Sequence, residues 1–517
     1  MKLLDFAVNT TNEYIEKMPK TLRKKYGQFF TGKETAVFMA ELFDIPADKT
    51  ELKILDAGAG SGLLSIALIE RLQSLSSLQK INLVCYENDS NIVELLNSNL
   101  CYASEYSKIE IVYEVRQDNY ILSQELEYNG MLGANPNPLK YDMVIGNPPY
   151  MKIAKDAPEA KVMPDVCYGA PNMYFLFASM GMYNLANDGE LTYIVPRSWT
   201  SGAYFKRFRQ KLLKDGALEH IHLFVSRDKV FEKESVLQET IIIKMRKTPC
   251  KPEKVAITTT QSSQDFLDKT TFEVPYETVV SGGDSYVYLV TNEQEVEMLN
   301  QLNCWGNTLP SIGLKMKTGL TVDFRNREVL KDESEGRAVP LFYSQHIQSG
   351  KVLFPIGKES EYIDTNKSGL LQENSNYLFV KRFTSKEEYR RLQCGVYLAR
   401  KNPQYEKIST QNKINFIDGL RGLSECVVYG LYVLFNSTLY DYYYRILNGS
   451  TQVNSTEINS MPVPPINIIE AMGKELIRLR DMSEKVCDQI LRSFIYEQNT
   501  GNKDDIERVT SAKQTAS

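Results

Sequence analysis

This chain of 517 residues lacks several features that would each have suggested a class of protein. Its only three histidines are His220, His222 and His346, which leaves little material for a histidine metal site or catalytic triad. The eight cysteines include no Cys-x-x-Cys pair, so we expect reduced, buried thiols and no metal site. No apolar run approaches 18 residues, and the N-terminus becomes polar too soon for a secretory signal. These absences predict a cytoplasmic protein without a membrane span.

An excess of positive charge is also missing. The formal net charge is −5, which argues against a general polyanion binder, and 43% apolar with 24% charged residues is typical of two or three soluble domains. Basic residues nevertheless crowd two stretches, 197–214 and 381–391. A solvated helix face is the ordinary interpretation of each stretch, but a surface that follows phosphates needs only local positive potential.

Polar residues end four predicted strands at a nearly constant spacing. Asp56, Glu87, Asp118 and Asn147 each follow an apolar segment, and they lie 31, 31 and 29 residues apart. A strand–helix–strand unit needs about 30 residues. The simplest interpretation is four parallel strands that present these side chains at one carboxyl edge, where open parallel sheets bind ligands.

Residues at the first three strand ends suit a nucleotide-like ligand. Gly58, Gly60 and Gly62 would let a ligand approach the backbone where a helix begins. Glu87 lies 25 residues beyond Gly62, near the position where nucleotide folds place an acid against ribose hydroxyls. Asp118 could accept from an adenine amino group. Taken singly, these residues fit a tight turn, a solvated acid and a helix cap, but their common spacing favours one site.

The fourth strand end is Asn147-Pro148-Pro149-Tyr150. Two prolines forbid the strand to continue and produce an extended corner. The Asn147 side chain and the Pro148 carbonyl then become two fixed acceptors, with the Tyr150 ring beside them. An exocyclic NH₂ on a flat heterocycle complements this corner, because it offers two donors and a ring that can stack.

These residues together resemble the γ-class S-adenosylmethionine-dependent DNA N6-adenine methyltransferases of type II restriction–modification systems. The resemblance covers about residues 20–465 and is carried by residues 26–31, 55–62, 87, 118, 147–150, 172–177, 188–196, 230–232 and 449–456. It implies a Rossmann-like, mostly parallel, seven-stranded methyltransferase sheet with helices on both faces, followed by a C-terminal mixed α/β target-recognition domain. The corresponding divisions are a catalytic domain at 1–247, a linker at 248–289, the recognition domain at 290–469, a C-terminal helix at 470–498 and a flexible tail at 499–517.

The resemblance also assigns site residues. The expected catalytic residues are Asn147, Pro148, Pro149, Tyr150 and Phe231, with the two aromatic rings stacking on the target base; a core position is an equally good interpretation of Phe231. The expected S-adenosylmethionine-binding residues are Tyr26, Thr31, Asp56, Ala57, Gly58, Gly60, Gly62, Glu87, Asp118 and Asn147.

The implied activity is methyl transfer to N6 of a flipped-out adenine in double-stranded DNA, which would protect host DNA from a cognate restriction endonuclease. We find no nuclease cluster and no room upstream for a cleavage domain, so we expect any endonuclease to be a separate chain. We also expect a monomer.

Four other classes of function stay open at this point. N4-cytosine methyltransferases also act on an NH₂ group but more often carry Ser before Pro-Pro. Protein-glutamine and RNA methyltransferases usually end soon after the catalytic sheet, whereas about 270 residues follow residue 247 here. A non-enzymatic subunit that only positions a partner on DNA would not need Glu87, Asp118 and Asn147 together.

Overall fold

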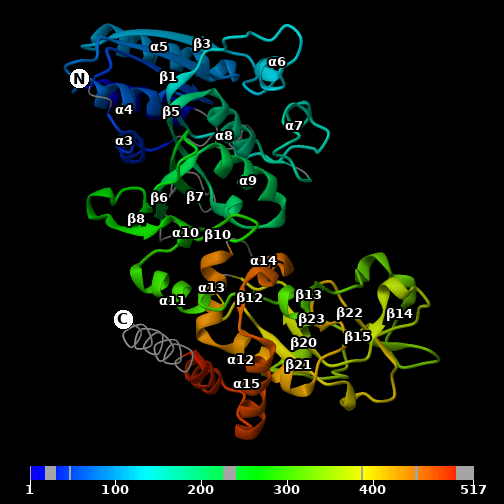
Figure 1. Cartoon of the computed structure of the whole chain (residues 1–517). Coiled ribbons are helices and arrows are strands. Elements are labelled where there is room, and N and C mark those ends of the chain that lie inside the picture. The colour runs from blue at the N-terminus through cyan, green and yellow to red at the C-terminus, as the bar shows by residue number, and fades with distance from the viewer. Residues whose placement is uncertain are drawn as a thin grey trace, which may run out of the picture. The chain divides into compact units, whose positions relative to one another are not determined.

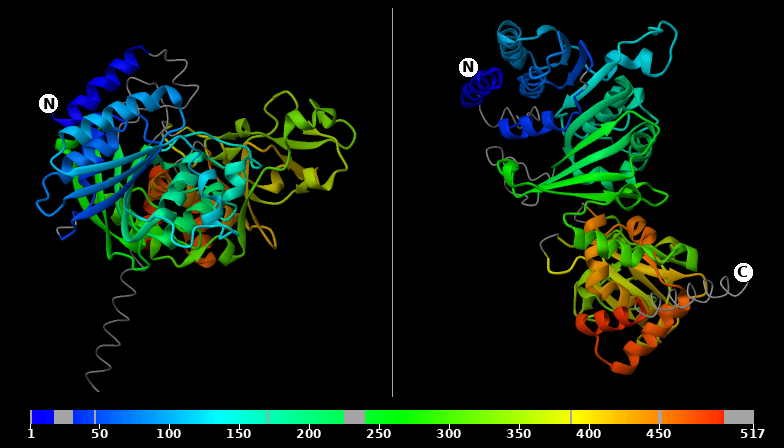
Figure 2. Two further views of the ribbon diagram at one scale, coloured as in Figure 1. Left: turned by 90° about the horizontal axis from the view of Figure 1, so that it is seen from above. Right: turned by 60° about the vertical axis from the view of Figure 1, so that its left-hand side comes forward.

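The computed structural model describes residues 2–17, 31–45, 48–169, 171–224, 240–385, 388–448 and 452–495. The chain forms two compact units, Met1–Glu293 and Gln294–Ser517. Figures 1 and 2 show the strands and helices of each unit.

Unit 1 is built on a nine-stranded sheet with the order β3-β2-β1-β4-β5-β7-β6-β8-β9. The first five strands in that order run parallel, and β7 lies antiparallel between β5 and β6. The strands are β1 (Glu51–Ala57), β2 (Lys80–Tyr86), β3 (Glu110–Arg116), β4 (Tyr141–Gly146), β5 (Leu185–Pro196), β6 (Ala217–Phe224), β7 (Thr240–Arg246), β8 (Lys254–Thr260) and β9 (Thr270–Pro275). A small separate sheet pairs β10 (Val280–Ser281) with β11 (Tyr286–Val287).

Helices cover both faces of this sheet. The helices of unit 1 are α1 (Leu3–Lys17), α3 (Lys33–Glu41), α4 (Leu63–Leu72), α5 (Ser90–Tyr106), α6 (Glu125–Tyr128), α7 (Pro158–Val162), α8 (Met173–Asn184), α9 (Lys206–Asp215) and α10 (Tyr276–Val279). Residues of α1, α3, α4 and α5 form one core cluster with Met143 and Ile145 of β4. Gly181 of α8 instead faces Val144. Because successive strand residues point to opposite faces, α8 packs on the other side of β4.

The sheet extends further than the seven strands that the sequence predicted. Residues 248–289, interpreted above as a linker, contain β8, β9, α10, β10 and β11. The prolines at 249 and 252 suggested a linker, but Val255 and Ile257 point to the same face and are fully buried. This alternation, in a segment rich in β-branched residues, stabilises β8 against β6.

A chain of buried hydrogen bonds connects β6 to β8. The Thr260 hydroxyl donates to the Ser262 carbonyl at 2.8 Å, so it accepts from His222 Nε2 at 3.2 Å. His222 Nδ1 is then the acceptor for the Thr258 hydroxyl, and Thr258 accepts in turn from His220 Nε2, both at 2.8 Å. Both imidazoles are neutral in this arrangement, and burial lowers the pKa of His220 to about 4 and that of His222 to about 3.

Unit 2 contains two larger sheets. Their orders are β13-β23-β20-β21-β17-β16 and β14-β18-β15-β22-β19, and β12 (Asn307–Thr308) pairs with β24 (Pro462–Val463). The strands of the six-stranded sheet are β13 (Leu314–Thr318), β16 (Ile347–Gln348), β17 (Lys351–Val352), β20 (Tyr377–Lys381), β21 (Cys394–Tyr397) and β23 (Ile414–Gly419). Those of the five-stranded sheet are β14 (Leu330–Lys331), β15 (Val339–Phe342), β18 (Tyr362–Ile363), β19 (Gln372–Glu373) and β22 (Lys407–Thr410).

The helices of unit 2 include a very close crossing. They are α11 (Glu293–Asn303), α12 (Glu425–Asn436), α13 (Thr438–Leu447), α14 (Ser455–Ser460) and α15 (Ile466–Leu479). A Cβ on Gly473 of α15 would lie 1.8 Å from the Cys426 carbonyl oxygen of α12, so only glycine allows this contact. The single helix expected at 470–498 is instead divided. α15 ends at Leu479. The next residue, Arg480, has a left-handed conformation, and helix resumes at 484–495. In the described residues, no helix is long and apolar enough to span a bilayer. The tail predicted at 499–517 lies outside the described residues.

Candidate functional site

The four predicted strand ends lie in a row at one edge of the unit 1 sheet. The register aligns Ala57 at the end of β1 with Tyr86 at the end of β2, and Tyr86 with Arg116 at the end of β3. On the other side of β1, Asp56 is paired with Ile145 of β4. The residues that follow β3, β2, β1 and β4 therefore meet at a common carboxyl edge.

A cavity of about 260 Å³ opens at this edge. Six residues predicted from the sequence line it: Gly58, Gly60, Glu87, Asp118, Asn147 and Pro149. The structure thus brings together predicted residues that are up to 91 positions apart in the chain.

The glycine loop after β1 forms part of the cavity wall and has no side chains that would fill the cavity. Gly58 and Gly60 have φ values of 76° and 55°, which disfavour residues with side chains. A Cβ on Gly58 would stand in the cavity wall, 3.6 Å from the Phe177 ring and 3.8 Å from Pro149. The loop is fastened to β2, because Gly58 N–H donates to the Tyr86 carbonyl at 2.8 Å.

Carboxylates dominate the charge of the cavity. Glu87 accepts backbone N–H groups from Gly60 and Asp89, each at 2.9 Å, and burial raises its pKa. Asp89, Asp118 and Glu159 also line the wall, whereas none of the lining residues is Lys or Arg. This wall favours a ligand that carries positive charge beside neutral hydrogen-bonding groups.

The Asn147 carboxamide is held by two neutral side chains. Its Nδ2 donates to the Thr31 hydroxyl at 3.2 Å, and its Oδ1 accepts from the Tyr150 hydroxyl at 2.8 Å. The Tyr150 hydroxyl also lies 3.0 Å from the Ile194 carbonyl, and the residue is 8% exposed. In this arrangement Oδ1 is the acceptor of the Asn147 amide and Nδ2 is its donor.

Several predicted site residues do not line the cavity. Asp56 is fully buried and accepts from the Ser65 hydroxyl at 2.7 Å, so it links β1 to α4. Burial raises the pKa of Asp56 to about 7. Ala57, Gly62, Pro148, Thr31 and Tyr150 are also absent from the wall, although Thr31 and Tyr150 contact Asn147. Tyr26 and Phe231 lie outside the described residues.

Sequence reasoning missed ten lining residues: Tyr86, Asn88, Asp89, Ile92, Asn119, Tyr120, Met151, Glu159, Met173 and Phe177. Met173 and Phe177 are four positions apart on α8, and that helical spacing beside the capping residue Asn172 was a detectable signal. Glu159 had no such signal. It is fixed in place by Asn119, whose Nδ2 donates to Glu159 Oε1 at 2.8 Å.

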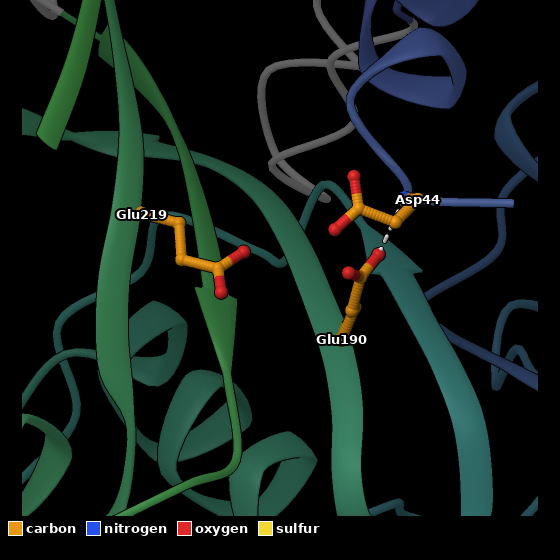
Figure 3. Close-up of side chains that lie close together, drawn as sticks. All are labelled: Asp44, Glu190 and Glu219. Carbon is orange, nitrogen blue, oxygen red and sulfur yellow. Dashed lines mark hydrogen bonds between the residues drawn. The ribbon is translucent and has the colours of Figure 1, made fainter. Parts of the chain in front are cut away.

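A second group of carboxylates in unit 1 is Asp44, Glu190 and Glu219 (Figure 3). Their oxygens could hold a metal by distance alone, but Lys244 Nζ lies 3.0 Å from Asp44 and 3.2 Å from each glutamate. Arg246 also pairs with all three carboxylates. The cluster is therefore an ion-pair network that ties the segment after α3 to the sheet.

Comparisons with known proteins agree with this architecture. A family model described as Eco57I restriction-modification methylase matches residues 67–231. The type II methyltransferase M.PstI of Providencia stuartii is 33% identical over 492 residues, covering 92% of this chain and 94% of that protein. The type II methyltransferase M.BsuBI of Bacillus subtilis is 34% identical over 467 residues, covering 88% and 91% respectively.

At the level of fold, one chain of a cryo-EM structure of a DrdV–DNA complex aligns with a TM-score of 0.51 at 14% identity. The alignment covers 92% of this chain and 59% of that one, and it supports the fold alone. M.PstI and M.BsuBI are more similar in sequence to this chain than the chain in the DrdV complex is. The chain belongs to the type II methyltransferases of restriction–modification systems.

Proposed function

We propose that this protein is a site-specific DNA methyltransferase that transfers the methyl group of S-adenosylmethionine to N6 of an adenine in double-stranded DNA. The observation that carries the proposal is the oriented Asn147 carboxamide at the margin of a cavity lined by acids. Its physiological role would be to protect DNA from a separate restriction endonuclease that acts on the same sequence.

The cavity fits S-adenosylmethionine in shape and charge. Gly58 and Gly60 leave space where a side chain would project, and Glu87 lies where it could accept from ribose hydroxyls. Asp118 and Glu159 would accept from the adenine amino group, while the acidic wall suits the sulfonium and ammonium charges. When bound, this group supplies an electrophilic methyl on sulfur.

Asn147 and Pro148 would act on the target amino group. The lone pair of an adenine N6 is delocalised into the ring, so the nitrogen is a poor nucleophile. Two acceptors, Asn147 Oδ1 and the Pro148 carbonyl, would hold both N–H bonds and favour a tetrahedral nitrogen as its bond to the methyl carbon forms and the bond from that carbon to sulfur breaks. The methylated nitrogen would then lose one proton to solvent. This interaction strengthens in the transition state and therefore accelerates transfer.

The target nucleotide has to leave the stack to reach this corner, at a cost of a few kcal/mol. In our proposal Tyr150 and Phe231 offset that cost by stacking, which contributes about 1–3 kcal/mol per base. Adenine is favoured over cytosine N4 because Asn147, rather than Ser, precedes the two prolines.

Single-molecule sequencing of DNA from cells that express the protein tests the modified base and its surrounding sequence together. We expect one short sequence to carry N6-methyladenine. Asn147→Ala should reduce transfer by about 100–1,000-fold, because a lost polar contact of this kind costs about 2.7–4 kcal/mol, while binding of S-adenosylmethionine persists. N4-methylcytosine at the site, or full activity of Asn147→Ala, would overturn the proposal.

A further inference from the structure

Three neighbouring strands of unit 2 end together on one surface. β13 and β20 both pair with β23, with Thr318 opposite Asn415 and Lys381 opposite Ile414. The turn 411–413, which precedes β23, therefore lies between the ends of β13 and β20, and Figure 1 shows the three strands side by side. Residues 452–454 join this surface, because Val453 N–H donates to the Arg382 carbonyl at 2.7 Å.

The surface carries cations without compensating acids. Residues 318–321, 381–385, 411–413 and 452–454 include Lys381, Arg382 and Lys413 but no Asp or Glu. Within the part of the chain that the structure describes, no carboxylate pairs with these three side chains. By contrast, Lys317 on β13 pairs with Asp418 at 2.7 Å. Positive potential is thus left at the strand ends of a chain whose net charge is −5.

Arg382 is held in position by neutral groups. Its Nη1 donates to the Asn412 carbonyl at 3.0 Å, and its Nη2 lies 3.4 Å from Gln452 Oε1. Its backbone N–H donates to the Lys413 carbonyl at 2.9 Å, which places the two basic residues side by side. A guanidinium has five N–H donors, so these contacts orient it without using all of them.

An aromatic ring adjoins these cations. Phe383 is 46% exposed, although its backbone is paired with that of Gln452 in an isolated bridge. The Arg382 guanidinium carbon lies 5.5 Å from the Phe383 ring centroid. We name Lys381, Arg382, Phe383 and Lys413 the basic rim. Cations beside an exposed aromatic ring match the alternation of phosphates and apolar sugar or base surfaces in nucleic acid.

We propose that the basic rim binds the backbone of duplex DNA, with Lys381, Arg382 and Lys413 on phosphates and Phe383 against the adjoining sugars. The inference rests on the proposed function and adds the surface by which unit 2 holds the substrate. Contacts of this kind position a duplex and contribute little sequence discrimination. Each phosphate contact releases counterions, so it contributes to the salt dependence of binding.

The test uses the full-length protein and two fluorescent duplexes, one with the methylated sequence mapped above and one without it. Binding constants are measured between 50 and 200 mM salt for wild type, Lys381→Ala/Lys413→Ala and Phe383→Ala. Lys474→Ala is the matched control, because Lys474 is an exposed lysine on α15 outside the rim. Circular dichroism verifies that each variant is folded.

We expect the double variant to bind both duplexes more weakly by the same factor, and its salt slope to fall in magnitude by about 1.8. Phe383→Ala should weaken binding with an unchanged slope, and Lys474→Ala should match wild type. A wild-type slope in the folded double variant, or weakening confined to the cognate duplex, would overturn the backbone assignment. The methylation assay with wild-type protein tests the proposed function separately. Absence of N6-methyladenine in that assay would contradict the proposed function, whereas the salt slopes of the variants test only the DNA contacts of the basic rim.

Discussion

Removing the Tyr150 hydroxyl separates the orientation of Asn147 from the stacking that we propose for the tyrosine ring. Tyr150→Phe keeps the ring but deletes the donor that lies 2.8 Å from Asn147 Oδ1 and 3.0 Å from the Ile194 carbonyl. A neutral hydrogen bond contributes about 0.5–1.5 kcal/mol net, and an acceptor left unsatisfied costs about 1–3 kcal/mol. If Tyr150→Phe destabilises the transition state by about 1–2 kcal/mol, methyl transfer becomes about 5–30-fold slower.

Single-turnover methyl transfer to a saturating cognate duplex measures this effect directly. We expect the rate constant to fall while the Kd for S-adenosylmethionine stays unchanged. Tyr174→Phe is the control, because the Tyr174 hydroxyl is also buried but lies 3.3 Å from Ser198 rather than next to Asn147. A wild-type rate in Tyr150→Phe, or an equal loss in both variants, would show that this hydroxyl does not orient the carboxamide.

Three further changes test the cavity and the packing. Glu159→Gln removes one carboxylate from the cavity wall, so the Kd for S-adenosylmethionine, measured by calorimetry, should rise about 1.4–5-fold, as expected for a charge contribution of about 0.2–1 kcal/mol; an unchanged Kd contradicts this. Burial lowers the pKa of His222 in the folded protein to about 3. The folded protein therefore binds this proton less readily than the unfolded chain does, so the free energy of unfolding is highest above the unfolded pKa of His222 and decreases as the pH falls. From pH 6.5 to 4 this amounts to about 3 kcal/mol, and His222→Gln should flatten the dependence of unfolding free energy on pH; parallel curves would refute the neutral pair. Gly473→Ala, whose Cβ would meet the Cys426 carbonyl, should cost about 1–3 kcal/mol in denaturant unfolding, whereas Gly369→Ala, with open space at its Cβ, should not.

The sequence was most informative where structure repeats at a local period. The spacing of Asp56, Glu87, Asp118 and Asn147 reflects consecutive strand–helix–strand units, so it predicted their alignment at one sheet edge. Position along the edge does not determine the direction of a side chain, however. Asp56 points into the core toward Ser65, whereas Glu87 and Asp118 line the cavity. Burial of a charged group depends on the neighbouring layer, which the spacing of strand ends does not encode.

The clusters of basic residues in the sequence were less informative, because the burial of each side chain again depends on the layer that packs against it. The basic stretch 197–214 was expected to be a solvated face, yet Arg209 is fully buried and donates to the Trp199 and Ser201 carbonyls at 3.0 Å. Arg391 in the second stretch is 1% exposed. Two other residues of this second stretch, Lys381 and Arg382 at the end of β20, belong to the surface that we assign to DNA. Which member of a basic stretch reaches solvent is decided by tertiary packing.

The two sides of the proposed reaction differ in charge in a way that suits methyl transfer from a cation to a neutral amine. The acids line the cavity that we propose for S-adenosylmethionine, and burial raises the pKa of Glu87 among them. Thr31 and Tyr150, which orient Asn147, are neutral, and burial raises the Tyr150 pKa so that it remains a hydroxyl donor near neutral pH. A fixed amide dipole can stabilise the positive charge that develops on the target nitrogen without accepting its proton. The scarcity of histidine noted at the outset is therefore consistent with the chemistry, because this corner needs oriented acceptors rather than a general base.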